Sequence, residues 1–155
     1  YIFYIMIKPW ATYSWYLFHT IAQRINPVYF KNNRKMCLGV IYSICDILPC
    51  PVCRDHAVKY LYNNKFFNII SKQELIMFFF NFHNEVNSRL GKNLAVVKDL
   101  NKYNYTNKNR LFHGFCNNMT ARYYNIAYFT QSKRQRRINK IKPFLLDIFN
   151  NMEKV

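Results

Sequence analysis

The chain has 155 residues, which suits one domain or one domain with an appendage. Three glycines and five prolines are too few for Gly-rich phosphate loops or a turn-dense β architecture, so helices are favoured. The formal charge of +16 is compatible with an anionic partner such as nucleic acid or lipid, and equally with codon bias and a solvated surface.

At the N-terminus, residues 1–7 are apolar but far shorter than the roughly 20 residues that a bilayer span needs. The absence of a starting Met is compatible with a fragment or a processed form. The apolar spacing then predicts one helix over 10–24 and, after a break, a second over 33–48 that Pro49 ends. A third helix is expected to begin around Cys50 and to continue for about three turns.

The fourth helix has the clearest start, because Ser71 and Glu74 form a capping-box pattern before an apolar run. It is expected to continue to Leu90, with Gly91 as its stop. A short fifth helix is expected over 96–103. Four helices joined by short loops predict an all-α fold built as a four-helix bundle.

The last third of the chain differs in character from the rest. Residues 1–105 carry thirteen basic and five acidic side chains, and residues 106–155 carry ten and two. An aromatic helix is predicted over 119–129, followed by a basic run over Lys133–Lys142 and a short helix that Pro143 opens. We therefore predict a bundle domain over 1–105 and a basic, aromatic-rich helical extension over 106–155. The apolar faces of the extension should pack on the bundle or at a dimer contact, with the basic run in solvent.

The five cysteines include a single CxxC motif, which favours a redox or metal site over a disulfide-stapled framework. Cys50 and Cys53 stand at the start of a predicted helix, whose N-terminus stabilises a thiolate, and Arg54 and His56 would add to that effect. The alternatives are two buried structural cysteines or half of a zinc site. A zinc site needs a second Cys or His pair at ligand spacing, and none completes the set, so no metal is predicted.

A second polar element follows in the fourth predicted helix. His83 and Asn87 are four residues apart and share a helix face, with Asn84 beside them. One imidazole and two amides along a groove are enough to bind a heterocycle or a ribose, and Lys92 can reach a phosphate. A polar surface stripe or a satisfied core histidine would give the same pattern.

Trp15 and His19 form a third pair at helical spacing, which by itself is also typical of aromatic core. The segments WxxxHT, PCxxC and HNxVNxxLGK, which begin at Trp15, Pro49 and His83, follow one another about thirty residues apart. In order, spacing and residue type they resemble the Erv/ALR sulfhydryl oxidases over roughly residues 8–105. The stretch LPCPVCRDHA is most similar to the minimal forms encoded by large DNA viruses.

The resemblance implies an Erv-like helical bundle that binds FAD between its helices, usually as a homodimer. Cys53 would lie next to the flavin, and Cys50 would exchange with substrate thiols. The cofactor-binding residues implied by the resemblance are Trp15, His19, His56, His83, Asn84, Val86, Asn87 and Lys92. Trp15 and His19 would line the flavin pocket, and Lys92 would lie near the pyrophosphate or the flavin edge.

The implied activity is disulfide formation in protein dithiols, with FAD passing the electrons to oxygen and hydrogen peroxide as product. The implied partners are a dithiol protein or a thioredoxin-like carrier, oxygen, and a second copy of the chain. The chain has no second CxxC, no cysteine spacing that obviously matches the family's structural disulfide, and none of the small and basic residues that precede the family's tryptophan. Cys37 and Cys45 are expected to be buried thiols, and Cys116 to be free or a donor to Cys50. The viral resemblance implies the host cytoplasm or the virion as location.

Two other functions fit part of the sequence. A flavin-free thiol-disulfide carrier would keep the CxxC but has no use for the HNxVN segment. A basic protein that binds nucleic acid or a membrane through Lys133–Lys142 would leave the cysteines incidental. Bound flavin in the purified protein distinguishes the oxidase from both.

Overall fold

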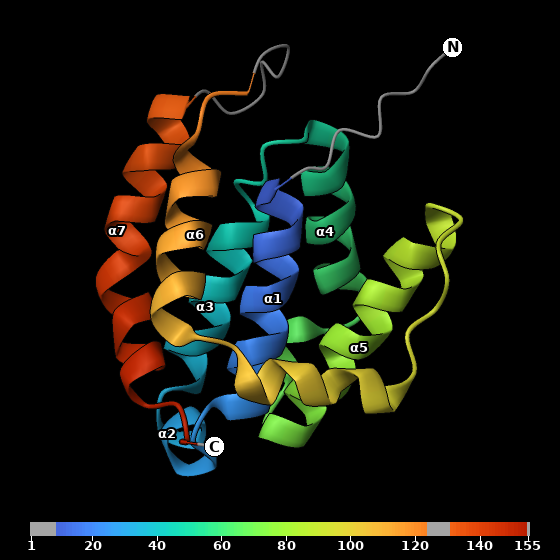
Figure 1. Cartoon of the computed structure of the whole chain (residues 1–155), viewed down its shortest axis with the longest axis vertical. Coiled ribbons are helices and arrows are strands. Elements are labelled where there is room, and N and C mark those ends of the chain that lie inside the picture. Colours follow the sequence, from blue (N-terminus) through green and yellow to red (C-terminus); the bar gives the residue numbers. More distant parts are fainter. Residues whose placement is uncertain (1–8, 124–130, 155) are drawn as a thin grey trace.

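The computed structural model describes residues 9–123 and 131–154, and in these ranges the chain is helical, with one isolated bridge between Ile25 and Met152. This confirms the all-α prediction. The elements are α1 (Pro9–Arg24), α2 (Pro27–Asn32), α3 (Arg34–Cys45), α4 (Pro51–Asn63), η1 (Phe66–Asn68), α5 (Lys72–Arg89), η2 (Val97–Tyr105), α6 (Lys108–Thr120) and α7 (Gln131–Asn150), where η marks a 3-10 helix. Helices α1 and α3 lie between α6 and α7 on one side and α4 and α5 on the other (Figure 1). None of the described helices is long and apolar enough to cross a bilayer.

Helix α1 ends where the sequence predicts, but a short helix that the sequence analysis missed follows it. Asn26 caps α2, because its Oδ1 accepts hydrogen bonds from the N–H groups of Val28 and Tyr29, both at 3.0 Å. Pro27 takes the first helical position, where its missing N–H costs nothing. The Asn-Pro pair therefore starts a helix as well as ending one.

The connection between α3 and α4 differs from the prediction. Helix α3 ends at Cys45 rather than at Leu48, and Ile47, Leu48 and Pro49 form a buried turn. A proline disfavours helical backbone at the residue before it, so the helix must stop ahead of Pro49, and burial of the two apolar side chains holds the turn. Helix α4 begins as predicted, with Cys50 as its N-cap.

Helix α5 confirms both of its predicted boundaries. The Oγ of Ser71 accepts a hydrogen bond from the N–H of Glu74 at 3.1 Å, while the Glu74 carboxylate reaches back to the N–H of Ile70 at 2.8 Å. At the other end Gly91 has a φ of 66°, the left-handed conformation that commonly terminates a helix. The predicted fifth helix is present as η2.

The extension consists of two helices whose limits differ from the prediction. Helix α6 stops at Thr120, so the aromatic helix predicted over 119–129 is wrong at its start, and residues 124–129 lie outside the described part. Helix α7 begins at Gln131 and runs through Pro143 instead of starting there. Pro143 is exposed, so water can satisfy the backbone carbonyl that loses its helical partner, while Ile141 and Leu145 beside it are buried.

The extension packs on the bundle, which is one of the two placements that the sequence analysis favours. Helix α6 lies against α1, and α7 lies against α3 and α6. The buried extension residues that join the common core are Leu111, Phe112, Phe115, Cys116, Met119, Ile138, Ile141, Leu145, Ile148, Phe149 and Met152. Arg134 belongs to the run predicted to stay in solvent, yet it is buried and donates to the backbone oxygens of Met119 and Ala121 at the end of α6. Those terminal carbonyls need donors, which explains the burial of its charge.

Candidate functional site

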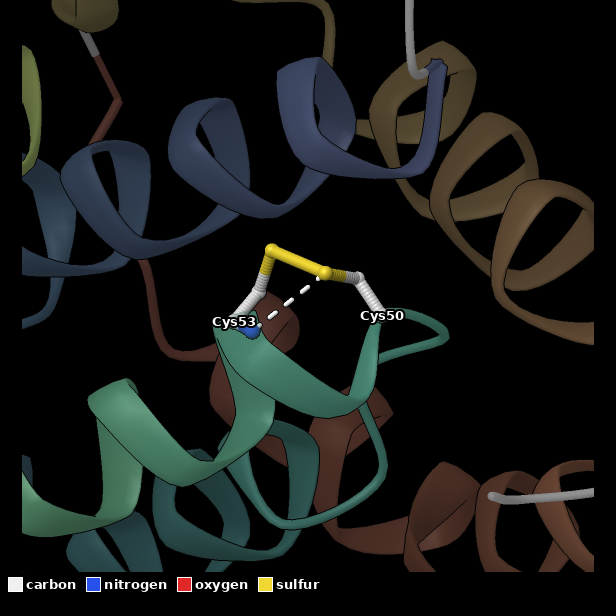
Figure 2. Close-up of a disulfide and its surroundings, with 2 residues drawn as sticks. All are labelled: Cys50 and Cys53. Carbon is white, nitrogen blue, oxygen red and sulfur yellow. Dashed lines mark hydrogen bonds between the residues drawn. A yellow bond between two sulfur atoms is a disulfide. The ribbon is translucent and has the colours of Figure 1, made fainter. Parts of the chain in front are cut away.

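The redox motif opens helix α4. Cys50 has an extended backbone and caps the helix, because its Sγ accepts a hydrogen bond from the N–H of Cys53 at 3.3 Å. The Cα atoms of the two cysteines are 5.2 Å apart and their sulfur atoms are joined in a disulfide. Figure 2 shows this disulfide on the side of α4 that faces α1. The partial positive charge of the helix N-terminus thus acts where a thiolate would form on reduction.

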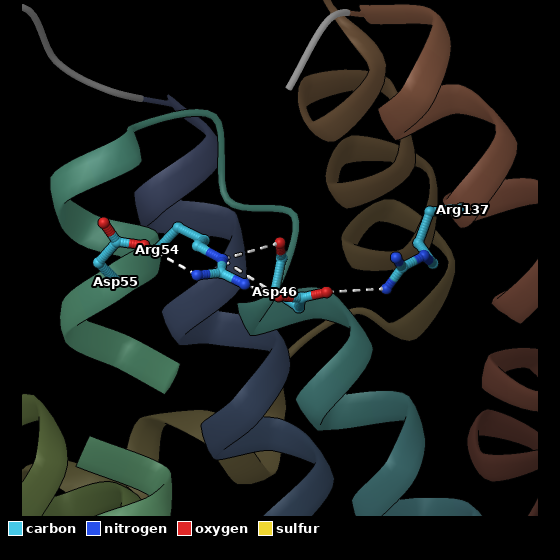
Figure 3. Close-up of polar contacts among 4 residues, drawn as sticks. All are labelled: Asp46, Arg54, Asp55 and Arg137. Atoms are coloured by element: carbon cyan, nitrogen blue, oxygen red, sulfur yellow. Dashed lines mark hydrogen bonds and ion pairs between the residues drawn. The ribbon is translucent and has the colours of Figure 1, made fainter. Parts of the chain in front are cut away.

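Arg54 and His56, predicted to support that thiolate, both contact carboxylates. The Arg54 guanidinium is held between Asp46 and Asp55 (Figure 3). The Nε2 atom of His56 lies 2.9 Å from Oε2 of Glu85 on α5, in a contact without hydrogen-bond alignment. The carboxylates of Asp46 and Asp55 offset part of the positive charge of Arg54, and the helix N-terminus contributes its own positive potential at the sulfurs.

Four rings from three elements form an aromatic and histidine cluster next to the bundle core. Trp15 stacks on His83 with centroids 4.0 Å apart and planes 3° apart. His19 stacks on Tyr103 of η2 at 4.6 Å. The Nε2 of His19 lies 2.9 Å from the Nδ1 of His83, so one imidazole donates an N–H hydrogen bond to the other. The structure therefore brings together three residues that the sequence could only place on two separate helices.

Both imidazoles of this cluster are neutral near neutral pH. Burial, with His83 and Lys102 nearby, lowers the pKa of His19 to about 3. Burial, with Lys102 and Lys92 nearby, lowers the pKa of His83 to about 4. The hydrogen bond between the two rings requires at least one neutral imidazole as acceptor, since two imidazolium groups would have none.

A pocket of about 420 Å³ opens beside this cluster. His19, His83 and Asn87 of the predicted set line it. The lining residues that the sequence analysis missed are Phe80 of α5, Ala95 and, from η2, Lys98, Asp99, Leu100, Lys102 and Tyr103. The sequence could have indicated Lys98 and Lys102, because they are four residues apart in a predicted helix and share a face of it. Whether that face points into a pocket depends on how η2 packs on α1.

Other predicted cofactor residues lie around the pocket rather than in its lining. Asn84 holds the loop after α5, because its side-chain amide bonds the N–H of Ala95 at 2.8 Å and the carbonyl of the same residue at 2.9 Å. Lys92 is exposed and donates its backbone N–H to the carbonyl of Asn87 at 2.8 Å. Val86 is half-buried against the core. Asn84 therefore positions Ala95, which lines the pocket. Direct contacts between the predicted cofactor-binding residues and a cofactor remain a prediction.

The three remaining cysteines are buried thiols, which confirms the expectation for Cys37 and Cys45. Burial raises the pKa of each of these two thiols to about 12. Burial also raises the pKa of Cys116 on α6, which argues against its predicted alternative role as a donor to Cys50. Within the described residues no group of three or more His, Cys, Asp or Glu side chains is arranged to hold a metal ion.

Fold and site define a helical protein with a disulfide at the start of α4 and a histidine-lined pocket formed by α1, α5 and η2. The chain belongs to the Erv1/Alr family, whose model matches residues 12–108. It is 37% identical over 92 residues to a protein of Invertebrate iridescent virus 3, 33% over 73 residues to one of Fowlpox virus, and 32% over 95 residues to one of Invertebrate iridescent virus 6. All three carry names that describe an FAD-linked sulfhydryl oxidase.

The matches cover part of each protein. They span 59%, 46% and 55% of this chain, and 62%, 69% and 82% of the respective relatives. The chain thus spans less than two thirds of the iridescent virus 3 protein. No solved structure gives a significant match. The family match ends where α6 begins, so most of the extension lies outside it.

Proposed function

We propose that this protein is an FAD-dependent thiol oxidase that forms disulfides in protein dithiols. The observation that carries the proposal is the Cys50–Cys53 disulfide at the start of α4 in a chain of the Erv1/Alr family. The names of the viral relatives support the same activity. A flavin-free carrier would need the disulfide alone, and the pocket lined by His19, His83 and Asn87 would have no purpose in it.

The residues around the pocket fit a flavin nucleotide. Neutral imidazoles and an amide offer hydrogen bonds to a heterocycle, and the Tyr103 ring adds apolar surface, while Trp15 supports the His83 ring from outside the lining. Lys98 and Lys102, with Asp99 between them in sequence, offer cations for a diphosphate. We propose that these side chains and the predicted set share in holding FAD. When bound, FAD accepts two electrons from the dithiol and passes them to oxygen.

The chain's own part of the reaction is thiol-disulfide exchange. A substrate thiolate attacks the Sγ of Cys50, a mixed disulfide forms, and Cys53 leaves as a thiolate. The second substrate thiol then attacks the mixed disulfide, which releases the oxidised substrate and leaves Cys50 reduced. The N-terminal amides of α4 stabilise the leaving thiolate. Val52, 70% exposed between the two cysteines, marks an open approach for a substrate protein.

The decisive test is the absorption spectrum of the purified full-length protein, together with oxygen consumption on addition of dithiothreitol. We expect a flavin spectrum with about one FAD per chain, oxygen uptake and hydrogen peroxide as product. A folded, colourless protein that takes up no FAD would contradict the oxidase. If such a protein still exchanged disulfides with dithiothreitol, it would be the flavin-free carrier.

The partners and the location belong to the same proposal. We propose a dithiol protein or a thioredoxin-like carrier as electron donor, a homodimer as the assembled form, and the host cytoplasm or virion as location. Because α6 and α7 cover α1 and α3, a second subunit would have to use another face. Sedimentation velocity of the full-length protein tests the dimer, and a monomer at micromolar concentration would contradict it. A nucleic-acid or membrane role through Lys133–Lys142 loses support, because Arg134 and Arg137 are engaged within the chain.

A further inference from the structure

An ion-pair network joins the two ends of the segment that carries both cysteines, residues 46–54. Arg54, which follows Cys53, donates through Nε to Oδ1 of Asp46 at 3.1 Å, and its Nη2 reaches the same oxygen. Its Nη1 donates to Asp55 at 2.8 Å. Asp46 is the C-cap of α3, so its contact with Arg54 ties the two ends of segment 46–54 together (Figure 3).

The network also reaches the C-terminal extension. Arg137 of α7 donates through Nη1 to Oδ2 of Asp46 at 3.3 Å, so that one carboxylate bonds two guanidinium groups from opposite sides (Figure 3). The side chain of Asp46 is 16% exposed and that of Arg137 is 33% exposed, so solvent screens this contact only in part. Arg137 lies outside the part of the chain that the family model matches.

We propose that Asp46 and Arg137 are positioning residues for the redox centre, and that the extension sets the stability of the Cys50–Cys53 disulfide through them. The inference rests on the proposed function, since it requires that this disulfide is reduced and re-formed. A disulfide is favoured when its two thiols are held close to each other before the bond forms. Loosening segment 46–54 returns conformational freedom to the reduced form and lowers the equilibrium constant for bond formation.

The negative charge of Asp46 and its contact with Arg54 both favour the disulfide over the reduced form. Its carboxylate offsets the cation of Arg54, which would otherwise favour a thiolate at the start of α4. Removing that carboxylate should therefore both loosen the segment and stabilise the reduced form. Asp46→Asn removes the charge with little change in shape.

The test measures the equilibrium in which two glutathione molecules reduce the protein disulfide to a dithiol and become one glutathione disulfide. Full-length protein with its FAD is equilibrated without oxygen in glutathione mixtures, and free thiols are trapped by alkylation and counted by mass. For Asp46→Asn we expect about a tenfold shift toward the dithiol, which corresponds to roughly 30 mV for a two-electron couple. For Arg137→Gln we expect a shift in the same direction of about threefold relative to the control, as suits a partly exposed ion pair.

The matched control is Arg136→Gln, which removes the same charge from an exposed neighbour on the same turn of α7. The double variant Asp46→Asn/Arg137→Gln should shift no further than Asp46→Asn, because Arg137 acts through Asp46. Hydrogen exchange of residues 46–54 should be faster in Arg137→Gln than in Arg136→Gln. Equal effects of the two arginine variants, or additive shifts in the double variant, would overturn the inference.

These outcomes separate the inference from the proposed function. If the unmodified protein forms no reversible Cys50–Cys53 disulfide, the thiol oxidase itself is wrong. If that disulfide cycles but Arg137→Gln behaves as the control does, only the role of the extension fails. Should Asp46→Asn not fold, the comparison of Arg137→Gln with Arg136→Gln decides alone.

Discussion

At the scale of residues, the two redox cysteines occupy different positions at the start of α4. Cys50 is the N-cap, and Cys53 lies in the first turn with its N–H directed at the Cys50 sulfur. A thiolate at either position gains from the helix N-terminus, but in the exchange one cysteine is attacked by the substrate thiolate and the other leaves as a thiolate. The resemblance implies that Cys50 exchanges with substrate thiols and that Cys53 lies next to the flavin.

The roles of the cysteines predict different phenotypes for their serine variants. Cys50→Ser should keep bound flavin and show a thiolate-to-flavin charge-transfer band from Cys53, whereas Cys53→Ser should lose that band. Both should lose dithiol oxidase activity by on the order of 100-fold or more, because neither can re-form the disulfide. Absorption spectra and oxygen consumption measure the two effects. Full activity in either variant would show that the assignment is wrong.

The His19–His83 pair predicts a loss of stability in acid. Because the pKa of each imidazole in the folded protein, about 3 and about 4, lies below the unfolded value of 6.5, the unfolded chain binds protons first as the pH falls. The stabilising contribution is fully present above pH 6.5 and decreases as the pH falls toward 4. Thermal unfolding between pH 7 and pH 4.5 should show this decrease, and His83→Gln should flatten it.

His113→Gln is the matched control for the pH experiment, since His113 is an exposed histidine on α6. It should leave the dependence of the melting temperature on pH as in the unmodified protein. The same slope in His83→Gln and in the unmodified protein would show that the buried pair does not govern acid stability.

At the scale of elements, α6 approaches α1 closely at one glycine. A Cβ atom added at Gly114 would overlap the ring of Tyr13, whereas no atom outside the helix lies within reach of one added at Gly39 on α3. Both glycines are inside helices, where alanine is intrinsically better by about 1 kcal/mol. The two positions therefore separate helix propensity from the contact between helices.

Gly114→Ala should destabilise the fold by about 1–2 kcal/mol net, because overpacking exceeds the gain in propensity. Gly39→Ala should be neutral or stabilising. Urea unfolding measures both, and the cost of Gly114→Ala should disappear in a Tyr13→Ala background, where the ring is absent. If Gly114→Ala were as stable as Gly39→Ala, α6 would not pack on α1 as described.

At the scale of the whole molecule, the bundle and the extension share one hydrophobic core. Arg24 at the end of α1 donates to the carbonyl of Thr106 at 2.9 Å and to that of Glu153, so it ties the bundle to both ends of the extension. The extension thereby covers faces of α1 and α3 that the bundle by itself would expose. We therefore expect the extension to affect the stability and the oligomeric state of the protein more than its cofactor chemistry.

Truncation after Tyr105 should therefore leave FAD binding in place but change the association state or solubility of the chain. The uncovered apolar faces of α1 and α3 are expected to meet a second copy or to drive aggregation. Sedimentation velocity and the ratio of flavin to protein absorbance measure these effects. A truncated chain that is as soluble as the full-length protein, with the same sedimentation coefficient, would contradict the expectation.

Several features of the protein were determined by the sequence because their causes are local. Ser71, Gly91 and the Cys50-Pro51 pair fix helix ends through hydrogen bonds and backbone preferences that span a few residues. The CxxC at a helix start and the three ordered motifs likewise indicate the class of chemistry without any tertiary contact.

Other features were decided only by the tertiary structure, because they depend on which faces meet. His19 and His83 become partners across 64 residues, and Lys102 reaches the same pocket from η2, since α1 packs against both α5 and η2. Helix α7 continues through Pro143 because its packing against α3 and α6 offsets the backbone hydrogen bond that a proline cannot make. The same packing brings Arg137 to Asp46. Local signals specify where each helix lies along the chain, whereas burial of apolar area between distant segments selects which helices become neighbours.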